Sequence, residues 1–127
     1  MKTILLIDDE QEYLDLISPR IEKWGYSVAS FLEGKKALEY LQSNKPDIVL
    51  LDLGLPDISG MKVLLETKTK SPEIVVWVVS AFNDPDLREQ AIKLKADDFI
   101  TKPFLPGDLK VKLREHFDQR SNLEKEG

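Results

Sequence analysis

The sequence contains no cysteine among its 127 residues and only one histidine, His116. Without cysteine the chain has neither a disulfide nor a thiolate metal site, which suits a reducing compartment. Long apolar runs are missing too, because the stretch that follows Thr3 holds only Ile4 to Ile7. Such a run is too short for the core of a signal peptide or for a membrane span. We therefore expect a soluble, cytoplasmic protein.

An excess of basic residues is also absent. The chain has 18 lysines and arginines against 23 aspartates and glutamates, a formal net charge of -5. A domain that binds nucleic acid usually presents a basic face, so we expect no direct nucleic-acid binding by this segment. There is no internal repeat and no low-complexity linker. The length fits one domain, and 42% hydrophobic residues are enough for a globular core.

Short apolar runs alternate with helical patterns along the chain. The clearest strand is Ile74 to Val79, which is rich in β-branched residues, and Ile4 to Ile7 and Ile48 to Leu51 resemble it. Weaker strand patterns cover Tyr26 to Phe31 and Phe99 to Thr101. A strand followed by a helix, repeated five times, predicts an α/β fold with a parallel sheet and helices on both faces.

Five helical patterns separate and follow these strands. Pro19 lies inside the first pattern, where it should kink the helix. We place one domain over residues 1–120 and a polar tail, or the start of a linker, over residues 121–127. The apolar residues expected on the helices, in chain order, are Leu14, Ile17, Ile21 and Trp24; Ala37, Leu38 and Leu41; Met61, Val63, Leu64 and Leu65; Leu87, Ala91, Ile92 and Leu94; and Leu109, Val111, Leu113 and Phe117.

Polar side chains follow the ends of four of the predicted strands. Asp8 and Asp9 come after the first strand and Asp52 after the third. Ser80 follows the fourth strand and Lys102 the fifth. Each of these has an ordinary explanation as a helix cap, a turn residue or a surface charge. The carboxyl ends of parallel strands meet at one edge, however, so together the residues indicate a site there.

The composition of this edge points to a phosphate site that holds a metal ion. Neighbouring carboxylates repel each other unless a cation neutralises them, and oxygen ligands without histidine or cysteine favour Mg²⁺ or Mn²⁺. Magnesium is often completed by phosphate oxygens, to which Lys102 and Ser80 offer a charge and a hydroxyl. No general base is apparent. We therefore expect Asp52 to receive a phosphoryl group as an acyl phosphate, in a protein that is not an enzyme with rapid turnover.

These motifs give the chain a clear resemblance to a known family. From about Ile4 to about Arg120 it resembles the receiver domain of two-component response regulators. That resemblance implies a (βα)5 fold: a doubly wound five-stranded parallel sheet of order 2-1-3-4-5 in a flavodoxin-like three-layer sandwich. The matching motifs are Asp8-Asp9, Asp52 within Leu51-Asp52-Leu53-Gly54-Leu55-Pro56, Gly60, Ser80-Ala81 and Lys102-Pro103-Phe104.

The resemblance also implies a role for each matching position. Asp52 would take the phosphoryl group from a sensor histidine kinase or a phosphotransfer protein. The metal ligands would be Asp8, Asp9, Asp52 and the backbone carbonyl of Gly54. Lys102 would pair with the phosphoryl group. Only self-phosphorylation and slow autodephosphorylation are expected as activities.

A switch is implied as well. Ser80 would move toward the phosphoryl group, and the Phe99 ring would turn inward and remodel the face made by the fourth helix, fifth strand and fifth helix. This change would control a partner or output domain, or a phosphorylation-dependent dimer. A cis bond is expected between Lys102 and Pro103. The bulk of Phe82 should limit attack by water on the phosphorylated form.

Three alternatives remain open. A pseudo-receiver would bind proteins without being phosphorylated, although the complete acidic set argues against it. A phosphatase of the haloacid dehalogenase type needs a second aspartate where this chain has Gly54, and a cap domain for which the length leaves no room. A flavodoxin-like FMN carrier needs a phosphate loop, where this chain has Asp8-Asp9-Glu10. The sequence does not tell whether the domain stands alone or precedes an output domain.

Overall fold

A computed structural model describes residues 1–81 and 84–126, with side chains up to residue 118. Strands and helices alternate along the chain, as the sequence predicts. The strands are β1 (Thr3–Ile7), β2 (Ser27–Phe31), β3 (Ile48–Asp52), β4 (Val75–Ser80) and β5 (Asp98–Thr101). The helices are α1 (Gln11–Lys23), α2 (Gly34–Ser43), α3 (Gly60–Lys70), α4 (Pro85–Lys93) and α5 (Pro106–Glu126).

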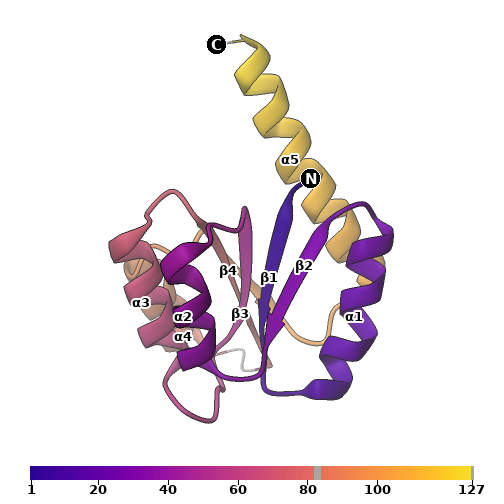
Figure 1. Cartoon of the computed structure of the whole chain (residues 1–127). Helices are drawn as coiled ribbons and strands as arrows, with labels where there is room; N and C mark the ends of the chain where they lie inside the picture. Colours follow the sequence, from indigo (N-terminus) through magenta and orange to yellow (C-terminus); the bar gives the residue numbers. More distant parts are fainter. Residues whose placement is uncertain (82–83, 127) are drawn as a thin grey trace.

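The strands form one parallel sheet in the order β2-β1-β3-β4-β5, which confirms the predicted fold. Figure 1 shows three layers: α2, α3 and α4 cover one face of the sheet, and α1 and α5 cover the other. Because all the strands run in the same direction, their carboxyl ends lie along a single edge. None of the helices in the described part of the chain is long and apolar enough to cross a membrane.

Two hydrophobic layers hold the sheet between its helices, since successive side chains of a strand point to opposite faces. In β3, Val49 and Leu51 pack toward α2, α3 and α4, and Ile48 and Leu50 pack toward α1 and α5. All four are at most 4% exposed. The apolar run of the sequence therefore becomes a strand buried on both faces, as is typical of parallel sheets.

Most of the apolar residues expected on the helices are buried or half-buried, but three point to solvent. Leu65 is 49% exposed, Ile92 58% and Val111 54%, so these three do not belong to the buried helix faces. A helix advances about 100° per residue, so its buried face covers only part of the circumference. In α3 that face includes Val63 and Leu64 and ends before Leu65, and in α4 it ends between Ala91 and Ile92.

Two of the helices bear on predictions made from the sequence. Pro19 lies inside α1, which runs as one helix from Gln11 to Lys23. The helix α5 runs to Glu126, so the backbone of the polar segment 121–126 continues this helix. In Figure 1 the C-terminal part of α5 extends beyond the sheet.

The single histidine of the sequence, His116, lies between two aromatic rings. Its ring centroid lies 5.6 Å from Trp77 and 5.1 Å from Phe117, with edge-to-face geometry in both cases. Trp77 itself is 4% exposed and fills the core under α5. Edge-to-face packing of this kind adds to the burial energy of the rings.

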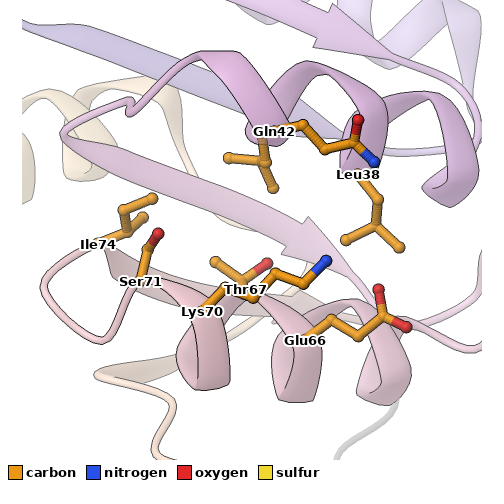
Figure 2. A pocket seen from close by; sticks show the side chains of 8 residues that line it. Leu38, Gln42, Glu66, Thr67, Lys70, Ser71 and Ile74 are labelled. Atoms are coloured by element: carbon orange, nitrogen blue, oxygen red, sulfur yellow. The ribbon is translucent and has the colours of Figure 1, made fainter.

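A small cavity of about 30 Å³ lies between α2 and α3, away from the carboxyl edge of the sheet. Leu38, Gln42, Glu66 and Thr67 are among the residues that line it (Figure 2). Thr67 is 5% exposed, and among the described residues its hydroxyl has no hydrogen-bond partner. A buried hydroxyl without a partner costs free energy, so this position is a weak point of the packing.

Candidate functional site

Three residues from distant parts of the sequence meet at the carboxyl edge of the sheet. Asp8 follows β1, Asp52 ends β3, and Lys102 follows β5. The ammonium of Lys102 donates to Asp8 Oδ2 at 2.5 Å and to Asp52 Oδ2 at 3.1 Å. The structure thus brings the two carboxylates and the lysine predicted from the strand ends into direct contact.

This charged group is largely withdrawn from water. The side chains of Lys102, Asp8 and Asp52 are 13%, 5% and 13% exposed. Burial raises the pKa of Asp8, and the hydrogen bonds from Lys102 and from the Glu10 N–H offset only part of that effect. Burial also pushes the pKa of Lys102 down, but the bond to Asp8 and the charge of Asp52 outweigh it and the pKa is raised. The Lys102 ammonium is stabilised by the negative charges of both Asp8 and Asp52. The two carboxylates share this one positive charge.

More negative charge surrounds this group. Carboxylate oxygens of Asp8, Asp9 and Glu10 lie within 4.8 Å of one another. Hard oxygen donors at this spacing fit the ligand chemistry of Mg²⁺. Asp52 is not part of this group of three, although it shares the Lys102 ammonium with Asp8. Glu10 was not predicted as part of the site, although its place directly after Asp9 is a signal that could have identified it.

The loop after β3 turns tightly around the Asp52 side chain. The Gly54 N–H donates to Asp52 Oδ1 at 2.8 Å, which orients the carboxylate. At Gly60, an added Cβ would lie 2.5 Å from Leu53 Cα and 2.7 Å from the Asp52 carbonyl oxygen. Only glycine allows the start of α3 to approach the end of β3 this closely.

The two predicted switch residues are buried beside this edge. Ser80 ends β4 at 1% exposure, and its carbonyl accepts from the Lys102 N–H at 2.8 Å. The Phe99 ring is 8% exposed, so the structure records it in the inward position. The guanidinium of Arg88, from α4, lies 5.7 Å from the centre of that ring. Phe82, expected to limit attack by water, lies outside the described residues.

An aromatic residue that sequence reasoning missed lies next to Lys102. The ammonium stands 4.4 Å from the centre of the Tyr13 ring, in the first turn of α1. The peptide bond from Lys102 to Pro103 is cis, as predicted. The contact between Tyr13 and Lys102 could not be predicted from the spacing of Tyr13 and Asp9 in the sequence, because it depends on the position of the loop after β5.

Comparisons with known proteins show the family to which the chain belongs. A family model described as the response regulator receiver domain matches residues 4–114. The structure is similar to a CheY-like response regulator receiver domain protein from Methanospirillum hungatei JF-1, with a TM-score of 0.91 and 28% identity over 100% of this chain and 99% of that one. It is also similar to the response regulator TrrA from Thermotoga maritima in complex with Mg(2+)-BeF, with a TM-score of 0.81 and 29% identity over 91% and 98% of the two chains.

One curated relative is longer than this chain. The alkaline phosphatase synthesis transcriptional regulatory protein PhoP of Bacillus subtilis is 29% identical over 113 residues. The match covers 89% of this chain and 47% of that protein, so this chain spans about half of the relative's length.

Proposed function

This chain belongs to the response regulator receiver domain family, and on that basis we propose that it is a cytoplasmic phosphoryl acceptor of a two-component system with Asp52 as the acceptor. The observation that carries the proposal is the contact of Asp52 with an ammonium shared with Asp8, at the edge where parallel sheets bind ligands. Asp52 is held by Gly54 and Lys102 and is withdrawn from water, which preorganises it for attack.

The proposed reaction moves one phosphoryl group. An oxygen of the Asp52 carboxylate forms a bond to the phosphorus of the donor, and the bond from phosphorus to the donor's leaving group breaks. With acetyl phosphate the leaving group is acetate, which departs with the electron pair. With a phosphohistidine it is imidazole. Lys102 would turn from Asp8 and Asp52 toward an oxygen of the phosphoryl group and offset its charge.

A divalent cation belongs to this proposal. Asp8 and Asp9 would bind Mg²⁺ or Mn²⁺, with Glu10 close enough to contribute and Asp52 and the Gly54 carbonyl as the further ligands that the family implies. The ion, when bound, would offset negative charge on the transferring group. The similar protein TrrA is described in complex with Mg(2+)-BeF, which supports a magnesium site at this edge.

The switch is proposed to run from Ser80 to Phe99. Both residues are buried and lie on adjacent strands, β4 and β5, so a shift of one is transmitted to the other through packing. The inward Phe99 ring seen here would be one of two positions. Phosphorylation would select between them and change the surface of α4, β5 and α5 for a partner.

The partners follow from this role. A sensor histidine kinase or a phosphotransfer protein would supply the phosphoryl group, and an output domain or partner protein, or a second copy of the domain, would read the switch. Slow loss of the phosphoryl group to water would be the only turnover.

The test is phosphorylation by a small donor. The protein is incubated with acetyl phosphate and Mg²⁺, and its intact mass is measured. One phosphoryl addition is expected for the wild type and none for Asp52→Ala or after removal of Mg²⁺ by a chelator. If the wild type stays unmodified, or if Asp52→Ala is modified equally, the proposal is wrong and the pseudo-receiver alternative gains support.

A further inference from the structure

We propose that Tyr13 is a positioning residue for phosphoryl transfer, because the face of its ring holds the Lys102 ammonium between Asp8 and Asp52. The inference deepens the proposed function and rests on it, since it takes Lys102 as the cation that meets the phosphoryl group. In this proposal Tyr13 acts through the lysine and takes no direct part in the chemistry.

The geometry is that of a cation–π contact. The Lys102 nitrogen stands 4.4 Å from the ring centre, well inside the distance of about 6 Å at which such contacts are attractive. The lysine side chain is only 13% exposed, so water screens the attraction little. Tyr13 and Lys102 come from α1 and the loop after β5, and their contact joins two elements that flank the site.

A neutral ring suits this position better than another acidic group. The ammonium has three donors, and Asp8 and Asp52 take two of them. A third carboxylate would bind the lysine more tightly to the protein and add repulsion against an arriving phosphoryl group. The ring attracts the cation without adding net charge, so the donors can turn to the phosphoryl oxygens while the nitrogen stays in place.

The Tyr13 ring is itself packed against a second aromatic ring. Phe104 meets it edge to face, at 6.4 Å between centroids and 84° between planes. Both rings line a cleft of about 240 Å³ together with Ile17 and Pro103. Burial raises the pKa of Tyr13 to about 12, so the ring stays a neutral phenol at physiological pH. The positioning therefore depends on the ring and not on ionisation of its hydroxyl.

The first test compares side chains at position 13. The rate constant for phosphorylation by acetyl phosphate at fixed Mg²⁺ is measured by intact mass. Tyr13→Phe should keep the wild-type rate, and Tyr13→Leu should lower it about 5- to 30-fold, which corresponds to about 1–2 kcal/mol. A matched control is Tyr26→Leu, which removes another partly buried tyrosine, packed against Phe117 and not against Lys102, and should leave the rate unchanged.

The second test separates positioning from a structural role. Phenylalanines with one, two and three ring fluorines at position 13 keep the shape of the ring but weaken its negative face. The rate should fall stepwise with each fluorine, while the urea midpoint stays constant. In a Lys102→Ala background the same series should be flat, because the cation is gone.

The outcomes distinguish this inference from the proposed function. If the wild type takes up no phosphoryl group, the proposed function fails and the inference fails with it. If the wild type is phosphorylated but the fluorine series is flat, or Tyr13→Leu reacts at the wild-type rate, the inference alone is overturned. A stepwise fall that persists without Lys102 would also overturn it.

Discussion

Thr67 is a buried hydroxyl whose surroundings, among the described residues, offer it no hydrogen bond. Valine has nearly the same shape and carries no polar atom. We expect Thr67→Val to raise the free energy of unfolding by about 1 kcal/mol, because the desolvation cost of the hydroxyl disappears. Urea denaturation followed by circular dichroism measures the change.

A neighbouring threonine provides the control for this prediction. The hydroxyl of Thr69 donates to the Leu65 carbonyl at 2.7 Å, so Thr69→Val removes a satisfied group and should give no gain. A loss of stability in Thr67→Val would contradict the account, since it would mean that the hydroxyl has a favourable partner.

For single residues, the sequence predicts which side chains reach the site but not all of their contacts. Asp8, Asp52 and Lys102 could be placed because each follows a strand, and parallel strands end at one edge. The contact of Tyr13 with Lys102 could not, since it depends on side-chain directions between α1 and a loop far along the chain. The inward ring of Phe99 is likewise a property of packing that no local pattern encodes.

The helix α2 begins with a cap from a distant loop. Asp57 accepts from the N–H groups of Gly34 at 2.9 Å and Lys35 at 2.8 Å, which would otherwise lack partners at the start of the helix. These backbone bonds, that from Lys35 first, hold the pKa of Asp57 below its ordinary value of 3.8. A cap 23 residues away in the chain is invisible to motif reading, which expects caps beside the helix.

The lowered pKa of Asp57 gives stability a defined pH dependence. The folded state holds the charged form more strongly than the unfolded state does, so the stabilisation is present above the ordinary value of 3.8 and is lost as the pH falls through the folded pKa. We expect Asp57→Ala to be less stable than the wild type at pH 7, with a gap that closes at strongly acidic pH.

Urea denaturation across this pH range checks the prediction. Glu39→Gln, which neutralises an exposed carboxylate on the same helix, is the control and should follow the wild type at each pH. A gap between Asp57→Ala and the wild type that is constant from neutral to strongly acidic pH would rule out a role for the charge.

In helix α5, the buried apolar residues attach the helix to the sheet and the exposed ones do not. Leu113 is fully buried, whereas Val111 is 54% exposed. Leu113→Ala should lower the free energy of unfolding by about 2–5 kcal/mol, because it leaves a cavity under the sheet. Val111→Ala should change it by less than about 0.5 kcal/mol. Equal losses in urea denaturation would mean that α5 packs with a different face.

For the molecule as a whole, the clustered carboxylates at the carboxyl edge repel one another unless a cation neutralises them. A cation that binds only the folded state should raise stability, by about 2.7 kcal/mol at a concentration about 100 times its dissociation constant. We therefore expect Mg²⁺ to raise the melting temperature of the wild type, measured by thermal denaturation with and without the ion.

Two variants test whether this gain comes from the site. Asp9→Asn should lose most of it, since Asp9 is one of the three clustered carboxylates. Asp15→Asn removes an exposed carboxylate of α1 outside that cluster and should keep the gain. A gain that Asp9→Asn retains in full would place the ion elsewhere.

The architecture was the most predictable level. Apolar runs buried on both faces, such as Ile48 to Leu51, occur in parallel sheets, and alternation with helices leaves few topologies open. The exposure of Ile92 and the packing of His116 between two rings were not predictable, because a helix pattern does not say where its buried face ends. Such prediction errors concern single side chains on the helices. They do not affect the prediction of which residues lie at the carboxyl edge of the sheet.

The assignment of Asp52 as the acceptor is tested by locating the phosphoryl group within the chain. Protein treated with acetyl phosphate and Mg²⁺ is reduced with borohydride, which converts an acyl phosphate of aspartate to homoserine, and its peptides are sequenced by mass spectrometry. We predict homoserine at position 52 and at no other aspartate. Homoserine at position 8 or 9, or none at all, would contradict the assignment of Asp52 as the acceptor.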